Sequence, residues 1–231
     1  MAASAADAPT GRTARHRGLL LRILSAVALG PLLIAAIWFG FPWIDLVAAV
    51  AAPLIVSEWI GLTRGRPLVR LLAIAYTLAA LTALLWLRHQ PAQGRETVMW
   101  IVLCIWATDI GAFVVGRLAG GAKLAPRISP GKTWSGLIGG MAWASVTSAV
   151  VSYAFDLGDT ITLAAIGAGL AVVGQIGDLI ESAAKRSAGV KDSGTLIPGH
   201  GGLLDRIDGL IAVLVVVAVI RLLVGGAWPW T

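Results

Sequence analysis

The stretch GLIAVLVVVAVIRLLVGGA, residues 209–227, is apolar except for Arg221, and it decides what kind of fold this chain adopts. A run of that length crosses a hydrocarbon core about 30 Å thick as an α-helix, which satisfies its own backbone polar groups. Earlier apolar runs are of similar length. We expect an all-α, polytopic integral membrane protein with roughly seven transmembrane helices, at about residues 23–41, 43–62, 69–87, 97–118, 134–155, 160–180 and 209–227.

The overall composition agrees with a membrane protein. Of 231 residues, 58% are hydrophobic and only 13% are charged, whereas an ordinary soluble domain has about 25% charged residues. The net charge of +6 would be compatible with a protein that binds nucleic acid, but the basic residues are divided among the connections between spans. Such loops attract anionic headgroups, so we expect membrane lipids and no nucleic acid as partners.

The positions of the basic residues predict the orientation in the membrane. Most Lys and Arg residues lie in the N-terminal tail and in the connections after the second, fourth and sixth spans, whereas Arg88 and Arg95 lie on the other side. The positive-inside rule then puts the N-terminus in the cytoplasm of a bacterial-type inner membrane. Residues 1–18 are expected to be a disordered basic tail, and residues 19–231 a single membrane-embedded domain.

Acidic residues gather in the later part of the chain. Asp178 and Glu181 lie at the cytoplasmic end of the sixth span, and Asp205 and Asp208 come three residues apart before the seventh. Asp109 lies inside the fourth span, where a carboxylate serves a site or pairs with a neighbouring helix. We therefore expect the chemistry on cytoplasmic loops of the second half of the chain.

A divalent cation would relieve the repulsion among these carboxylates. Mg²⁺ prefers oxygen ligands and completes its shell with water and substrate phosphates. The nearby basic side chains of Lys185, Arg186, Lys191 and Arg206 suit phosphate oxygens that a metal leaves uncovered. Acidic groups for a metal and basic groups for phosphate together favour phosphoryl or nucleotidyl transfer.

A second basic segment, GRLAGGAKLAPRISPGKTWSG, residues 116–136, connects the fourth and fifth spans. Its GKT is not a nucleotide P-loop, because Pro126 stands where the motif requires its first glycine and no strand precedes it. We expect a loop that turns at residues 129–131. It would offer Lys132 and Thr133 near the start of the next helix, where free backbone N–H groups favour an anion.

The segment SAAKRSAGVKDSGTLIPGHGGLLDRID, residues 182–208, closely resembles the signature of the phosphatidate cytidylyltransferases, also called CDP-diglyceride synthetases. The stretches GQIGDLIES, residues 174–182, and SPGKTWSG, residues 129–136, are also similar to this family. The resemblance covers about residues 97–210, which we take as the catalytic region. Residues 19–96 are then expected to be scaffold spans.

The resemblance implies an Mg²⁺-dependent transfer of CMP from CTP to phosphatidate, giving CDP-diacylglycerol and pyrophosphate in phospholipid biosynthesis, by a homodimer. It implies that Asp178, Asp205 and Asp208 are catalytic and hold one or two metal ions. Lys191 and Asp192 join the catalytic set, with Asp192 either orienting Lys191 or entering the metal shell. The substrate-binding residues that it implies are Ser129, Lys132, Lys185, Arg186, His200, Gly201, Gly202 and Arg206.

Three alternatives stay open at this point. His200 either hydrogen-bonds a substrate or leaving group, or is a structural loop histidine. A related enzyme would use another lipid phosphate as acceptor, or would be a CTP-dependent lipid kinase. A secondary transporter would also carry acids within its spans, but it typically has repeated halves and a site at the midplane. This sequence shows no internal repeat, and its acids gather toward one face.

Overall fold

Six long apolar helices dominate the computed structural model, which describes residues 27–197, 201–225 and 229. All six are long and apolar enough to cross a membrane, which confirms the expected all-α, polytopic membrane fold. They are α2 (Trp43–Leu62), α3 (Pro67–Arg88), α4 (Gly94–Ala119), α5 (Trp134–Phe155), α6 (Thr160–Ser187) and α7 (Leu204–Val224).

A shorter apolar helix, Val27–Phe39, precedes α2 and lies within the predicted span at 23–41. The expected tail at residues 1–18 lies outside the described residues. Helices α2 and α5 begin and end where hydropathy predicts. Helix α6 continues to Ser187 and α7 begins already at Leu204, so both are longer at one end than the apolar runs that predicted them.

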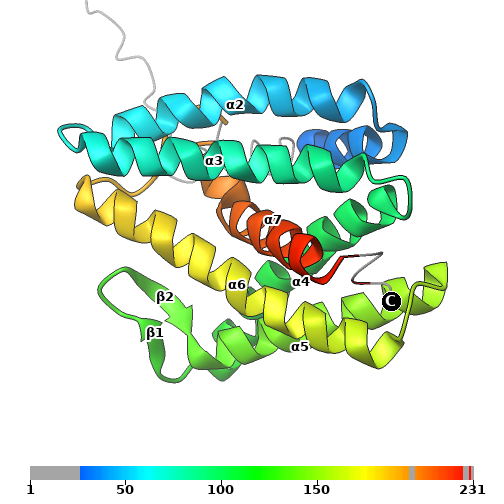
Figure 1. Ribbon diagram of the computed structural model, residues 1–231. Helices are drawn as coiled ribbons and strands as arrows, with labels where there is room; N and C mark the ends of the chain where they lie inside the picture. Colours follow the sequence, from blue (N-terminus) through cyan, green and yellow to red (C-terminus); the bar gives the residue numbers. More distant parts are fainter. Residues whose placement is uncertain (1–26, 198–200, 226–228, 230–231) are drawn as a thin grey trace, which may run out of the picture.

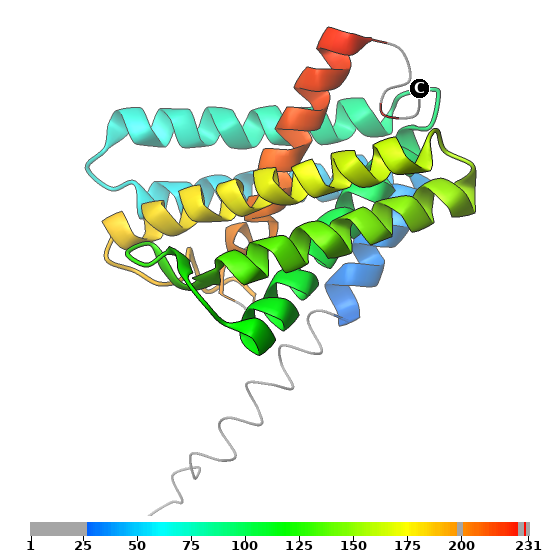
Figure 2. The same cartoon turned by 90° about the horizontal axis from the view of Figure 1, so that it is seen from below.

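The helices are arranged around α4 and α7. Helices α2 and α3 lie side by side, as do α5 and α6, while α4 packs against α5 (Figure 1). Helix α7 contacts both α3 and α6 and crosses them at a steep angle (Figure 2). The core includes the fully buried Trp100 of α4, whose indole Nε1 donates a hydrogen bond to Ser148 Oγ of α5, 2.9 Å away.

Glycines let α5 approach α4 closely. A Cβ atom at Gly136 would lie 2.9 Å from the backbone oxygen of Ala112, and one at Gly140 would lie 2.9 Å from that of Thr108. Small residues at a membrane helix interface allow such contact between backbones. The close contact fixes the two ends of the segment that connects these helices.

That segment forms a hairpin instead of the expected loop. Strand β1 (Lys123–Ala125) pairs antiparallel with β2 (Ser129–Thr133). The turn predicted at residues 129–131 is wrong: Ile128 N donates to Ala125 O, 3.1 Å away, and Pro126 takes the second turn position, for which its fixed φ is suited. Thr133 caps α5 by accepting from Gly136 N at 3.0 Å, so Lys132 lies just before the helix as expected.

Candidate functional site

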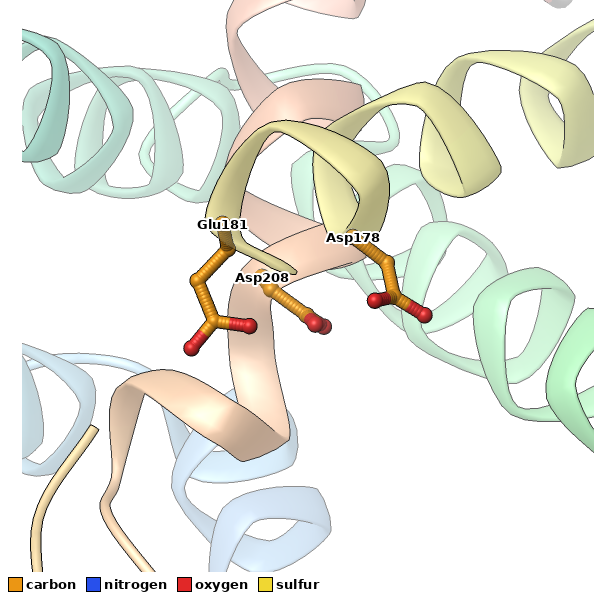
Figure 3. Close-up of side chains that lie close together, drawn as sticks. All are labelled: Asp178, Glu181 and Asp208. Carbon is orange, nitrogen blue, oxygen red and sulfur yellow. The ribbon is translucent and has the colours of Figure 1, made fainter. Parts of the chain in front are cut away.

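Three carboxylates from two helices lie together near the start of α7. Asp178 and Glu181 come from α6, and Asp208 comes from α7. Each offers one oxygen atom, and these oxygens all lie within 4.8 Å of one another. Figure 3 shows the Asp208 carboxylate between those of Asp178 and Glu181, with all three directed to the same side.

Glycines at the crossing of α6 and α7 bring these carboxylates together. A Cβ atom at Gly177 would lie 2.8 Å from the backbone oxygen of Asp208 and 2.7 Å from Ala212 Cβ. A Cβ atom at Gly209 would lie 3.1 Å from the backbone oxygen of Gly174. Gly177 directly precedes Asp178, and Gly209 directly follows Asp208. The close contact of the two helices at these glycines therefore also sets the distance between the two carboxylates.

Two lysines flank the carboxylates. Lys132 Nζ, at the end of the hairpin, lies 2.6 Å from Asp178 Oδ2. Lys185 Nζ lies 2.8 Å from Glu181 Oε2 and 2.7 Å from Asp205 Oδ1. The site therefore alternates negative and positive groups within a few ångströms, as the sequence predicted for a metal and phosphate site.

The donor set fits a divalent cation. Glu181 is only 2% exposed, and its Oε1 atom is buried without a hydrogen-bond partner among the described residues. A buried carboxylate oxygen without a partner is costly, so a ligand that satisfies it is favoured. Three carboxylates that supply only oxygen atoms match the preference of Mg²⁺. Asp178, Glu181 and Asp208 are thus suited to hold such an ion.

Asp205, expected to be a third metal ligand, makes different contacts. Its side-chain oxygens accept from Ser193 N at 3.0 Å, from Gly202 N at 2.8 Å and from Lys185 Nζ. Within the group that could hold a metal, the third place belongs to Glu181. The sequence signal for Glu181 was its position three residues after Asp178 at the end of the predicted sixth span.

Other predicted site residues lie on β2, at the end of α6, in the connection that follows it and in the first turn of α7. Arg186 is exposed, and its guanidinium donates to the backbone oxygens of Ile128 and Val190, which ties the hairpin to the end of α6. Ser129 is half-buried in β2. Three further predicted residues have exposed side chains: Lys191, Asp192 and Arg206. Their roles at the site stay predictions.

The glycines before α7 hold Asp205 in place. Gly201 has a positive φ of 88°, which favours glycine, and a Cβ atom there would lie 2.8 Å from Asp205 Oδ2. Gly202 donates its N–H to the same oxygen. Whether their backbone also contacts a phosphate stays a prediction, and His200 lies outside the described residues.

Asp109 of α4 lies beside the site. It is exposed, and it interacts electrostatically with Asp178, Lys132 and Arg206. Of the two alternatives for this carboxylate, the structure therefore favours a place in the polar site over an isolated pair between helices.

Glu58 of α2 contacts the segment that leads into α7, although it lies in a span that was expected to be scaffold. It is 7% exposed and accepts hydrogen bonds from Leu203 N and Leu204 N, each at 2.8 Å, and from Ser193 Oγ at 2.9 Å. The only sequence signal was an acid in an apolar run. Nothing in the sequence pairs it with residues that follow about 145 positions later.

An open pocket of about 520 Å³ lies between the turn after α2 and the connection from α6 to α7. Its lining includes Arg64, Arg66, Asp192 and Ser193. Guanidinium groups recognise phosphate oxygens well. The pocket therefore offers room and positive charge next to the segment that contacts Asp205.

Comparison with known proteins identifies close relatives. The sequence model described as the Cytidylyltransferase family matches residues 65–224. The phosphatidate cytidylyltransferase of Brucella suis biovar 1 is 42% identical over 169 residues, which cover 73% of this chain and 61% of that protein. Its namesake from Rickettsia bellii is 36% identical over 200 residues, covering 84% and 86%. That from Haemophilus influenzae is 38% identical over 197 residues, covering 78% and 65%. The chain thus spans about three fifths of the length of the Brucella relative.

Proposed function

Since the chain belongs to the cytidylyltransferase family, we propose that it transfers CMP from CTP to phosphatidate, giving CDP-diacylglycerol and pyrophosphate. The observation that carries the proposal is the group of three carboxylates flanked by Lys132 and Lys185 at one end of a membrane bundle. The names of the relatives supply the substrate class. A site at a helix end gives a water-soluble nucleotide access to a lipid headgroup.

Asp178, Glu181 and Asp208 would hold Mg²⁺, as one or two ions. When bound, the metal would neutralise phosphate charge and stabilise the pentacoordinate transition state. Glu181 is fixed on one side by Lys185, and Asp178 by Lys132, so these carboxylates are held in place before substrate arrives.

The bond changes are simple. A phosphate oxygen of phosphatidate attacks the α-phosphorus of CTP, a new P–O–P bond forms, and the bond from that phosphorus to the bridging oxygen of pyrophosphate breaks. The attacking phosphate is ionised near neutral pH, so no strong general base is needed. Lys132 lies close enough to the carboxylates to contact a phosphate oxygen and lower the repulsion between the two anionic substrates.

We extend the proposal to the orientation and assembly. The basic hairpin and the end of α6 lie at the same end of the bundle (Figures 1 and 2), the carboxylates lie on α6 and near the start of α7, and the positive-inside rule favours the cytoplasm for that end. A bacterial inner membrane agrees with the organisms of the relatives. A homodimer rests on the family resemblance alone.

The test is an assay of the purified full chain in detergent with CTP, phosphatidate and Mg²⁺. We expect CDP-diacylglycerol and pyrophosphate in equal amounts, and neither product when EDTA exceeds the metal. Diacylglycerol and lysophosphatidate serve as alternative acceptors. If phosphatidate gives no product while another acceptor does, phosphatidate is the wrong substrate; if no acceptor reacts, the transferase function is wrong.

A further inference from the structure

We propose that Glu58 of α2 is a positioning residue for the metal-binding carboxylates, because it holds the first turn of α7 and with it Asp208. The effect on turnover rests on the proposed function, whereas the effect on metal binding and on local structure does not. Glu58 precedes the residues matched by the family, which begin at position 65. Only the fold brings it to the site.

Glu58 caps a helix to which it does not belong. Leu203 is the N-cap residue of α7, and no side-chain hydrogen bond of its own caps the helix. The first N–H groups of a helix need acceptors from elsewhere. Oε1 of Glu58 accepts from Leu203 N and Oε2 from Leu204 N, each at 2.8 Å. A carboxylate at this position also interacts favourably with the helix dipole.

The surrounding chain leaves room for this carboxylate. A Cβ atom at Gly202 would lie 2.7 Å from both Glu58 oxygens, and one at Gly194 would lie 3.0 Å from Oε1. Ser193 links two carboxylates, since its hydroxyl donates to Glu58 and its backbone N–H donates to Asp205. Glu58 and Asp205 together therefore fix the segment that leads into α7.

The first turn of α7 controls the metal-binding group. Asp208 follows Leu204 by four residues, about one helical turn, so both lie on the same face. A shift of the first turn would move the Asp208 carboxylate relative to Asp178 and Glu181, which come from α6, a helix tied to the hairpin through the contact of Lys132 with Asp178. Glu58 thus acts on the reaction through Asp208 without touching a substrate.

The decisive variant is Glu58→Gln, which keeps the size of the side chain but replaces one acceptor oxygen by a donor. Groups that orient metal ligands change metal affinity or activity by about 10–100-fold when they are replaced. We expect the half-saturating concentration of Mn²⁺ to rise about tenfold and kcat to fall about 10–100-fold, with KM for CTP changed much less. Glu58→Asp keeps the charge and should recover part of the loss.

The matched control is Asp45→Asn. Asp45 is an acid on the same helix that pairs with His89, 3.1 Å away, and it takes no part in the site. This control should bind Mn²⁺ and turn over CTP like the wild type. Ser193→Ala removes one of the three bonds to Glu58, so its effects should lie between those of the control and Glu58→Gln.

The experiment uses the full chain in detergent and three readouts: hydrogen exchange of residues 201–208, Mn²⁺ binding followed by electron paramagnetic resonance, and CTP turnover. We expect faster exchange of this segment and weaker Mn²⁺ binding in Glu58→Gln, with the exchange of α5 unchanged. The proposal is overturned if this segment exchanges in Glu58→Gln at the rate of the wild type, or if that variant binds Mn²⁺ with the affinity of the wild type. It is also overturned if the wild-type protein itself binds no Mn²⁺. Wild-type protein that binds Mn²⁺ but makes no CDP-diacylglycerol instead refutes the proposed reaction, and leaves the positioning effect to be read from the first two measurements.

Discussion

Replacing Lys185 by Met should destabilise the folded protein strongly, because this one cation neutralises two buried acids. Lys185 is 8% exposed, and its Nζ atom lies 2.8 Å from Glu181 and 2.7 Å from Asp205. Methionine retains most of the apolar stem but not the charge. Removing one partner of a buried ion pair costs about 3–5 kcal/mol. Asp205 keeps its two backbone N–H donors, so we take the lower end, about 3 kcal/mol.

Thermal unfolding in detergent, followed by tryptophan fluorescence with EDTA present, measures this effect. A loss of about 3 kcal/mol corresponds to a fall of about 6–12 °C in Tm for a chain of this length. The control is Lys123→Met, which removes an exposed lysine of β1 and should shift Tm by less than about 2 °C. A Tm for Lys185→Met within that same small range would refute the role given to the buried lysine.

Three other variants test the site. Gly177→Ala should separate α6 from α7 and lower turnover by about 100-fold, while Gly169→Ala on the same helix, where a Cβ atom meets nothing within 4 Å, should leave turnover unchanged in the same assay. Asp208→Asn should abolish turnover and remove the rise in Tm that Mg²⁺ causes, without lowering Tm in EDTA, because it removes a negative charge from a crowded group. Asp205→Asn should weaken the hydrogen bonds that Ser193 N and Gly202 N donate to this carboxylate, and lower the free energy of unfolding by about 1.5–3 kcal/mol. Chemical denaturation measures this change, and an unchanged free energy of unfolding would contradict the role of these hydrogen bonds.

Hydropathy predicts the bounds of a span well where the helix and its apolar run end together, as they do in α2 and α5. Helix α6 continues past residue 180 because Glu181, Ser182 and Lys185 are buried against other helices, so polar residues extend the helix where a hydropathy pattern ends. The same reason explains the early start of α7.

The sequence indicated the kinds of residue in the candidate site, but not which carboxylates lie together. Acidic and basic residues of the α6–α7 region were identified from their spacing, and the structure brings Asp178 and Asp208 together. Which third carboxylate joins them depends on the crossing of two helices at glycines, and spacing along one chain does not determine that crossing. The resemblance implied Asp205 as a ligand, which stays a prediction, whereas the crossing of the two helices brings Glu181 into the group.

Glu58 and the β1–β2 hairpin were missed for different reasons. The contacts of Glu58 span about 145 residues, and a single acid in an apolar run does not indicate its partner. The hairpin has only short strands, β1 and β2, and its glycines and prolines fit a loop equally well. Pro126 was the signal for the true turn, since proline suits the second position of a turn.

The most direct measurement distinguishes transfer of CMP from transfer of a single phosphoryl group. It follows CTP labelled at the α-phosphate and CTP labelled at the γ-phosphate in the reaction with phosphatidate and Mg²⁺. The chemistry proposed for Asp178, Glu181 and Asp208 predicts that label at the α-phosphate appears in the lipid product and label at the γ-phosphate appears in pyrophosphate. Both transfers should disappear in Asp208→Asn. Label from the γ-phosphate in the lipid would instead identify a kinase, and full transfer by Asp208→Asn would contradict the role of the carboxylate group.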